Sequence, residues 1–384
     1  MSDLPLSGLR VLDLTRLLPG GFCTLLFADL GAEVLKVEDT GMGDYIRWSP
    51  PYYEGAEDSA KSALYLSLNR GKRSIRLNLK EERGREVLLK LAREYDVLLE
   101  SFRPGVLDRL GVGWDVLHEV NPGLVYCAIT GYGQNGPLRS RAGHDLNYLA
   151  RTGVLGLSGE AGGPPVQAAA QIADIAGGAL MAAFGIMAAL RSGVGQFVDI
   201  SMADGALSLL AMPAAGLLAG GEVPRRGELV LGGRLLCYRV YECADGYVSM
   251  GALEPKFWAA FCRGVGREDL IGAQFDAPGS AAHAEVSAVL RSRTRAEWEA
   301  FNAEHDCCLE PVLELDEVVD DGQVRARGMI VDGLLATPVR LSETPADHAR
   351  GGPPGLGEHT SEVLGAAGYD AGEIAALREL GAVK

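Results

Sequence analysis

The chain has 384 residues and a mass of 40.6 kDa, enough for more than one domain with its own core. Its 36 Lys and Arg against 51 Asp and Glu give a formal net charge of −15, which disfavours a general surface for nucleic acid or anionic membranes. The seven Cys and an N-terminal segment without a basic start and a long apolar run do not indicate a secreted, disulfide-bonded protein. We therefore expect a cytoplasmic, enzyme-sized protein that binds neither nucleic acid nor membrane.

Short β-rich runs alternate with helical patterns in the first part of the chain. We expect strands at Arg10–Leu14, Val34–Val37, Ser74–Leu79, Val97–Leu99, Leu124–Ile129 and Gln196–Ile200, and helices at Cys23–Leu30 and Glu82–Tyr95. Such alternation is typical of a parallel sheet with helices on both faces.

Two apolar stretches rich in Ala and Gly follow, Ile175–Leu190 and Ala206–Gly221. Both are shorter than the roughly 20 residues that span a bilayer. Because small side chains let helices approach closely, we expect helices of the core or of a subunit interface.

The pattern changes in the last third of the chain. Tyr238–Cys243 and Tyr247–Ala252 flank an Asp-Gly turn, which predicts an antiparallel hairpin. Helices are expected at Lys256–Val265, Ala281–Arg291 and Arg295–His305. We therefore expect an α/β protein with a large domain (1–200), a helical linker (201–228), a small α+β domain (229–330) and a C-terminal return to the large domain (331–384).

The sequence does not support a dinucleotide-binding motif or a metal site. Gly131-Tyr-Gly133-Gln-Asn-Gly136 fits the spacing GxGxxG, but Pro137 follows at once and no helix opens there, so an irregular loop is expected rather than a dinucleotide site. The six His are scattered, and no metal site is expected.

Basic residues cluster locally in this acidic chain. The cluster comprises Arg70, Lys72, Arg73, Arg76 and Lys80, and Arg103 and Arg109 come after the next predicted strand. Ligands of open α/β sheets bind at the carboxyl ends of the strands, and guanidinium groups suit phosphates. The cluster thus suggests a polyphosphate ligand; a solvated basic surface is the alternative.

Three residues are candidate acid–base groups. His144 follows a loop, Asp174 is a lone carboxylate in an apolar segment that opens a helix, and Glu254 ends the second hairpin strand. Burial would raise the pKa of Asp174, whereas a helix N-terminus would lower it. The alternatives are a hydrogen-bonded core histidine, a helix N-cap and an exposed loop carboxylate, respectively.

Nearly end to end, the chain resembles the class III CoA-transferase (CaiB/BaiF) family, which includes α-methylacyl-CoA racemase. The resemblance is carried, in chain order, by Leu6–Asp13, Asp29–Val34, Gly71–Ser74, Leu77–Lys80, Phe102–Gly105, Gly131–Gln134, Ala142–Tyr148, Ala173–Asp174, Gly251–Pro255 and Gly357–Thr360.

The resemblance implies a Rossmann-like large domain, a smaller α+β domain and an obligate, interlocked homodimer. It also implies an acyl-CoA thioester as substrate and no prosthetic group. The residues expected to contact CoA are Lys72, Arg73, Leu77, Asn78, Leu79, Lys80, Ser101, Phe102, Arg103, Arg109, Ala142, Gly143 and Tyr148. Where many members of the family carry Arg, this chain has Asp39.

The resemblance implies two uses of Asp174. In the racemase branch, which carries a Gly-His-Asp-x-Asn-Tyr sequence as found at Gly143–Tyr148, a His and this Asp exchange the α-proton of the thioester, and a Glu at the position of Glu254 orients the His. In the transferases the Asp attacks the thioester and CoA moves to another acid. We expect racemase-type 1,1-proton transfer by His144 and Asp174, with CoA transfer as the alternative. A non-catalytic acyl-CoA-binding protein is disfavoured because His144, Asp174 and Glu254 occur together.

Overall fold

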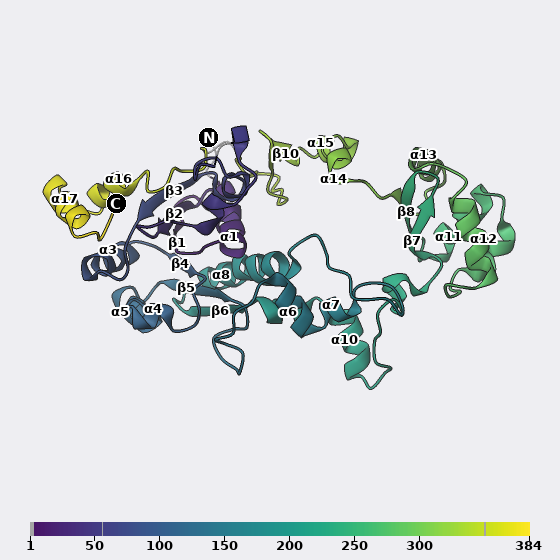
Figure 1. Ribbon diagram of the computed structural model, residues 1–384, viewed down its shortest axis with the longest axis horizontal. Helices are drawn as coiled ribbons and strands as arrows, with labels where there is room; N and C mark the ends of the chain where they lie inside the picture. Colours follow the sequence, from purple (N-terminus) through teal and green to yellow (C-terminus); the bar gives the residue numbers. More distant parts are fainter. Residues whose placement is uncertain (1–3, 56, 349–350) are drawn as a thin grey trace. The chain divides into compact units, whose positions relative to one another are not determined.

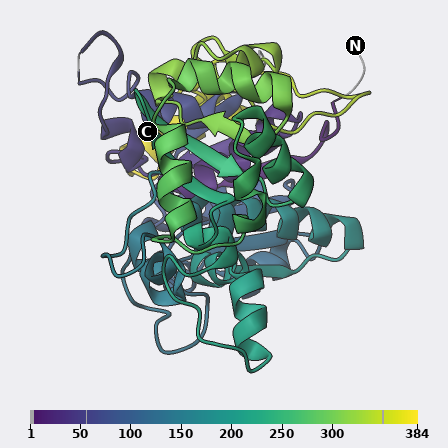
Figure 2. The ribbon, with the colours of Figure 1, turned by 90° about the vertical axis from the view of Figure 1, so that its right-hand side faces the viewer.

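The computed structural model describes residues 4–55, 57–348 and 351–384. The chain divides into two compact units. Unit 1 contains Met1–Thr152, Ala168–Leu209 and Gly328–Lys384, and unit 2 contains Gly153–Gln167 and Leu210–Arg327. Figures 1 and 2 show the chain from two directions, coloured along the sequence.

Unit 1 is built on a six-stranded sheet with the order β3-β2-β1-β4-β5-β6, and all its neighbouring strands are parallel. The strands are β1 (Arg10–Asp13), β2 (Glu33–Glu38), β3 (Lys72–Arg76), β4 (Val97–Glu100), β5 (Val125–Thr130) and β6 (Phe197–Ser201). This confirms the expected parallel sheet. The chain adds strands in one direction from β1 and then in the other from β4, which is the doubly wound, Rossmann-type order.

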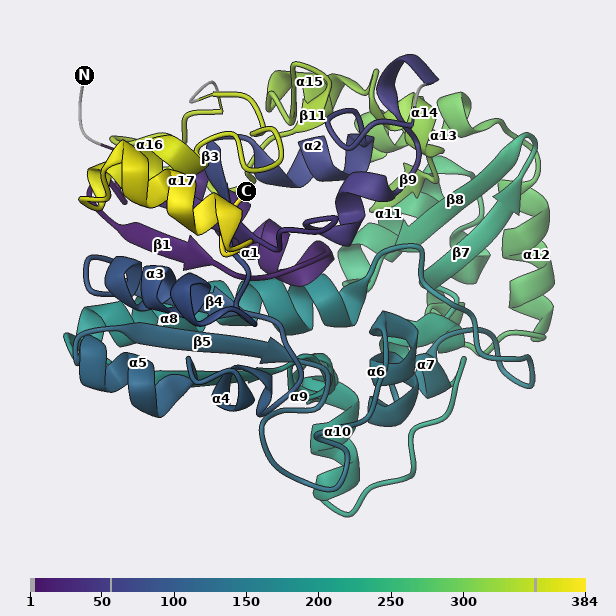
Figure 3. The same cartoon turned by 60° about the vertical axis from the view of Figure 1, so that its left-hand side comes forward.

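Helices cover both faces of this sheet (Figure 3). One face packs against α3 (Glu82–Ala92), α5 (Trp114–Val120), α16 (Thr360–Ala366) and α17 (Ala371–Glu379) in a single apolar cluster. The other lies against α1 (Leu18–Asp29) and α8 (Met181–Ser192). Because both faces are covered, β4 and β5 are buried along their whole length, which accounts for their apolar sequences.

The remaining elements of unit 1 are short. They are α2 (Ala63–Asn69), α4 (Val106–Arg109), α6 (Asp145–Thr152), α9 (Met202–Ser208), the 3-10 turns η1 (Tyr45–Trp48) and η2 (Tyr53–Gly55), the π-helical η3 (Ala173–Leu180), and the two-stranded sheet of β10 (Ile330–Val331) and β11 (Leu334–Leu335).

The first apolar stretch forms one continuous helix. Among the described residues, Ala173–Ser192, which joins η3 to α8, is the one helix long and apolar enough to cross a membrane, with a mean hydropathy of 1.7. It packs against β5, β6 and α1. The second stretch does not form a single helix. α9 ends at Ser208, and a new helix, α10 (Ala211–Leu218), begins at Ala211.

A close backbone contact fixes η3 against α9. A Cβ atom added to Gly205 would lie 2.1 Å from the carbonyl oxygen of Gly177, and one added to Gly177 would lie 2.7 Å from that of Met202. Only glycines permit this approach, so the two glycines set the position of the turn that carries Asp174.

Most basic side chains of the segment that follows α2 have partners inside unit 1. The Lys72 Nζ atom is buried, donates to Thr24 Oγ1 at 2.7 Å and lies 3.5 Å from Asp13 Oδ2. Burial lowers the pKa of Lys72 to about 8. Arg70 pairs with Asp29 at 2.6 Å.

Two further members of the cluster also have internal partners. Arg73 pairs with Glu362 at 2.9 Å, and Arg76 donates to carbonyl oxygens of residues 39–41. Within the part of the chain that the structure describes, Lys80 is the member whose side chain has no such partner.

Unit 2 contains a three-stranded antiparallel sheet of β7 (Tyr238–Cys243), β8 (Gly246–Gly251) and β9 (Leu309–Pro311). The β7–β8 pair confirms the predicted hairpin. Around the sheet lie α11 (Pro255–Gly264), α12 (Ala281–Leu290) and α13 (Arg295–His305), in green in Figure 2. Their core is aromatic, with Trp258, Phe261 and Trp298 almost fully buried.

Unit 2 also has short helical segments. They are α7 (Val154–Leu157), α10, the π-helical turn η4 (Val230–Arg234), the 3-10 helix η5 (Glu268–Ala273), α14 (Leu315–Val318) and α15 (Gly322–Ala326).

Candidate functional site

A cavity of about 710 Å³ opens at the carboxyl edge of the parallel sheet in unit 1. Its walls are the segments that follow β1, β4 and β5, the loop before α6, and η3. It therefore lies where the strand order reverses, the position at which open α/β sheets bind ligands. The lining residues used below are Arg16, Tyr45, Ser101, Phe102, Arg103, Arg139, Arg141, Ala142, Gly143, His144, Tyr148 and Asp174.

Hydrogen bonds hold the turn after β4 in place. The buried Glu100 carboxyl accepts from the Phe102 backbone N–H at 2.5 Å, and Ser101 Oγ accepts from the Arg16 N–H at 3.1 Å. Burial raises the pKa of Glu100 to about 8. The turns after β1 and β4 are thereby joined, which fixes Ser101, Phe102 and Arg103 at the cavity wall.

His144 immediately precedes α6 and presents its ring to the cavity. Its backbone N–H donates to Asn147 Oδ1 at 3.0 Å, which is the three-residue spacing of a helix cap, and the Tyr148 hydroxyl donates to the Gly143 carbonyl at 2.6 Å. The His144 side chain is exposed, and its ring makes no hydrogen bond with the described residues. The core-histidine alternative therefore does not apply.

Asp174 lies inside the first turn of η3 rather than at its cap. The N-cap residue is Ile172, and the first N–H groups of η3 are satisfied by Asp145, whose Oδ1 accepts from the N–H of Ala173 at 2.6 Å and of Asp174 at 3.0 Å. The Asp174 carboxylate is partly buried and makes no hydrogen bond with the described residues, so it is available to a ligand. π-Helical turns such as η3 occur frequently at functional sites.

The surroundings of Asp174 favour its neutral form. Burial raises the pKa of Asp174 to about 6, with a further increase from the negative charge of Asp145, while His144 acts in the opposite direction. Burial also raises the pKa of Tyr148 to about 12, assisted by the charge of Asp174. A carboxyl group with a pKa near 6 can both accept and donate a proton close to neutral pH.

Four arginines supply positive charge to the cavity. Arg16 is held by Asp39 at 2.8 Å and donates to the Tyr45 hydroxyl at 2.6 Å. Arg103, Arg139 and Arg141 are exposed, and their side chains make no hydrogen bond or ion pair with the described residues. Free guanidinium groups beside a cavity suit an anionic ligand such as a phosphate.

Sequence reasoning missed Arg16, Arg139 and Arg141 as site residues. The available signal was their position, since Arg16 follows β1 and the other two lie in the loop that follows β5. The Asp39 carboxylate accepts a hydrogen bond from Arg16 and so holds this guanidinium group at the wall.

The structure brings some predicted site residues together and not others. Ser101, Phe102, Arg103, Ala142, Gly143 and Tyr148 line the same cavity as His144 and Asp174. The residues that do not line it are Lys72, Arg73, Leu77, Asn78, Leu79, Lys80 and Arg109.

These residues lie outside the cavity for different reasons. Leu77 is buried in the core and bridges to Val383, and Arg109 ends α4 in an exposed position. Asn78 and Lys80 follow β3, so they lie at the same carboxyl edge of the sheet as the cavity, beyond β2.

Glu254 belongs to unit 2. It immediately precedes α11, and its side chain makes no capping hydrogen bond. Its charge contributes, after burial, to raising the pKa of the Cys308 thiol. Among the described residues, no group of three or more His, Cys, Asp or Glu could hold a metal ion.

Comparisons with known proteins identify the family of this chain. The model of CoA-transferase family III matches residues 6–360. Mouse (Mus musculus) alpha-methylacyl-CoA racemase is 36% identical, with 97% of this chain and 96% of the relative covered. Mouse succinyl-CoA:glutarate CoA-transferase is 34% identical, covering 97% and 89%. The crystal structure of a CaiB/BaiF family protein from Brucella suis has a TM-score of 0.84 and 32% identity, covering 95% of this chain and 100% of that one.

The position of Asp145 predicts how the pKa of Asp174 can be changed. Replacing Asp145 with Asn removes one negative charge and keeps an oxygen that can cap η3, so the pKa of Asp174 should fall from about 6 toward the ordinary value for Asp. Carboxyl ¹³C NMR titration measures this, with the resonance identified by its loss in Asp174→Asn. Glu86→Gln, on α3 away from the cavity, is the control, and an unchanged or higher pKa in Asp145→Asn would contradict the assignment.

Proposed function

The chain belongs to CoA-transferase family III, and we propose that within this family it is a 2-methylacyl-CoA racemase, which transfers a proton between the two faces of the α-carbon of a CoA thioester. The observation that supports this activity is the pairing of His144 and Asp174 at one cavity. The two side chains come from different elements, the start of α6 and η3, and neither is used in hydrogen bonds with the described residues.

A 1,1-proton transfer needs two acid–base groups on opposite sides of the reacting carbon. In the proposed reaction, one of the pair removes the α-proton to give the enolate of the thioester. The other then delivers a proton to the opposite face, and the two groups exchange roles in the reverse direction. In the interlocked dimer that the resemblance implies, Glu254 of the partner subunit would orient His144.

CoA is proposed to enter this cavity along the carboxyl edge of the sheet. Arg16, Arg103, Arg139 and Arg141 would bind its phosphates, and the pantetheine arm would carry the thioester to His144 and Asp174. Asn78 and Lys80 lie at the same edge, after β3, and we propose them as contacts for the adenosine end.

CoA transfer is the second candidate, and the state of the Asp174 carboxylate favours it. The group is partly buried and has no hydrogen-bonding partner among the described residues, as a nucleophile requires. Attack on the thioester carbonyl would form a mixed anhydride and release CoA as its thiolate. The thiolate would then attack the Asp174 carbonyl of the anhydride, which forms an enzyme thioester and releases the donor acid as its carboxylate. The acceptor carboxylate would attack this enzyme thioester, giving a second mixed anhydride and free CoA thiolate, and attack of the thiolate on the acceptor carbonyl would form the new acyl-CoA and restore Asp174. A non-catalytic acyl-CoA-binding role would leave both side chains without a task.

The two activities differ in what His144→Ala does. If racemisation is right, this variant should lose about 10²–10⁴-fold in α-proton exchange starting from one stereoisomer and retain partial exchange from the other. The measurement is deuterium incorporation from D₂O into each stereoisomer of a chiral 2-methylacyl-CoA, without any free carboxylic acid. Leu146→Ala, in an exposed position on α6 that does not line the cavity, is the matched control.

CoA transfer would give the opposite pattern. Acyl exchange would then depend on an added carboxylic acid, Asp174→Asn would abolish it, and His144→Ala would retain near-normal turnover. An acyl-enzyme adduct at Asp174, trapped with hydroxylamine or borohydride alongside such a His144→Ala variant, would replace the racemase proposal with the transferase.

The proposed CoA position predicts unequal effects of two basic residues. Arg103→Ala should weaken CoA binding by about 10- to 100-fold, because a guanidinium–phosphate pair beside a cavity is lost. Lys80→Ala should weaken it only a few-fold, because this exposed ammonium is screened by solvent. Calorimetry of CoA binding at two salt concentrations tests both, with Arg83→Ala on α3 as the control. Unchanged affinity in both variants would refute the proposed position.

We also propose that the protein is a homodimer, since apolar side chains lie uncovered on two helices. Phe184 on α8 and Met212 and Leu218 on α10 are 74%, 69% and 86% exposed. Sedimentation equilibrium should give twice the chain mass of 40.6 kDa at micromolar concentration, and Phe184→Glu should weaken this association. A folded wild-type monomer at that concentration would contradict the proposal.

A further inference from the structure

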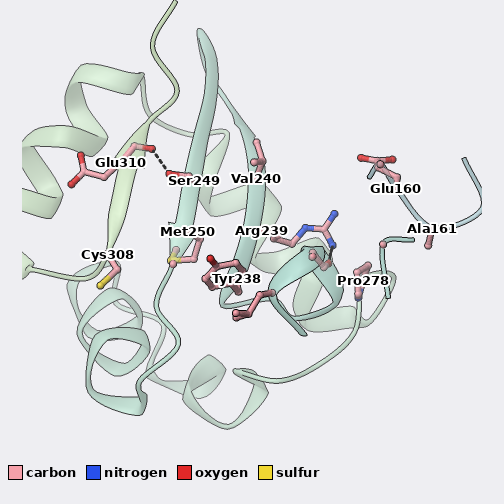
Figure 4. A pocket seen from close by; sticks show the side chains of 16 residues that line it. Glu160, Ala161, Tyr238, Arg239, Val240, Ser249, Met250, Pro278, Cys308 and Glu310 are labelled. Carbon is pink, nitrogen blue, oxygen red and sulfur yellow. Dashed lines mark hydrogen bonds between the residues drawn. The ribbon is translucent and has the colours of Figure 1, made fainter. Parts of the chain in front are cut away.

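Unit 2 contains a cavity of its own, about 740 Å³ in volume, which the proposed reaction leaves unassigned (Figure 4). It is bounded by β7 and β8, by the turn η4, by Cys308 before β9, and by residues 159–161. Much of the wall is apolar, including Leu231, Val240, Met250 and Pro278. Sites for small organic ligands usually combine such walls with a few polar groups.

Arg239 is the single basic side chain among the residues that line this cavity. It is partly buried on β7, and its Nη1 donates to the Gly233 carbonyl at 3.4 Å, a long hydrogen bond. Its Nε atom is buried without a partner, and no carboxylate of the described residues lies within ion-pair distance of its guanidinium group. The guanidinium carbon lies 5.5 Å from the centre of the Tyr241 ring. A partly buried guanidinium group without a counter-charge can take a ligand carboxylate.

Two carboxylates also line the cavity and restrict where a negative ligand group can lie. Glu310, on β9, accepts from Asn302 Nδ2 at 3.0 Å and is separated from Arg239 by the intervening strand β8 (Figure 4). Glu160 lies on the wall formed by residues 159–161, and it forms no ion pair with Arg239. The positive end of the cavity is therefore the part next to Arg239.

We infer that Arg239 binds the carboxylate of a short aliphatic acid, whose chain lies against the apolar wall. The inference goes beyond the proposed function, because it assigns a second ligand site that lies within unit 2. A planar guanidinium group can take a carboxylate with two parallel hydrogen bonds, and the walls admit a chain of methylene groups.

Binding is tested first without any thioester. The probe is glutarate, with the uncharged glutaramide as comparison, titrated calorimetrically into the full-length protein. Arg239→Met should weaken glutarate binding by about 10- to 100-fold, and Arg239→Lys should recover part of it, since lysine keeps the charge but not the planar fork. Arg234→Met is the matched control, because Arg234 is exposed, lies five residues away and does not line the cavity.

Several results would overturn the inference. They are the absence of measurable glutarate binding, equal binding of glutaramide, and an Arg239→Met variant that binds glutarate as tightly as the wild type. Glu160→Gln, which removes a competing negative charge, should keep or strengthen glutarate binding, and weaker binding in that variant would also count against Arg239. Thermal unfolding of every variant separates loss of the site from loss of the fold.

Failure of the proposed function has a different signature. Glutarate binding that depends on Arg239, in a protein that processes no acyl-CoA, would reject the enzyme activity and keep the carboxylate site.

Discussion

The Asp145 carboxylate joins the two halves of the candidate site, and the arrangement of the acid–base pair depends on it. Asp145 directly follows His144 in the chain, and its Oδ1 accepts the first N–H groups of the helix that carries Asp174. The Asp145 side chain thus fixes both the loop that carries His144 and the helix that carries Asp174. Its negative charge also adds to the effect of burial on the pKa of Asp174, so the same contact sets both geometry and protonation.

Backbone packing completes this arrangement. The contact of Gly177 with Gly205 presses η3 onto α9, and a β-carbon at either position would push the two apart. The Asp145 carboxylate fixes the start of η3, and the contact of Gly177 with Gly205 fixes the face of η3 that packs against α9. The helix can therefore hold a partly buried carboxylate that makes no hydrogen bond with the described residues, because the backbone, and not the side chain, determines where Asp174 lies.

Those parts of the fold and site that rest on local patterns could be predicted from the sequence. Alternating apolar runs gave the parallel strands, and the Asp-Gly turn gave the β7–β8 hairpin. The internal partners of the basic cluster could not be predicted, because those of Lys72 and Arg70 lie far away in the chain, at Asp13 and Asp29. A run of basic residues has the same sequence pattern whether its side chains are solvated or paired with carboxylates far away in the chain.

Long-range pairing also orients a basic side chain at the cavity. The Asp39 carboxylate holds Arg16 at the cavity wall, and Tyr45 accepts a second hydrogen bond from the same guanidinium group. The positive charge at this wall thus comes from the turn after β1, with Asp39 after β2 as its support. An anionic ligand at this wall would meet an oriented guanidinium group, and the entropy of ordering that side chain is already spent in the free protein.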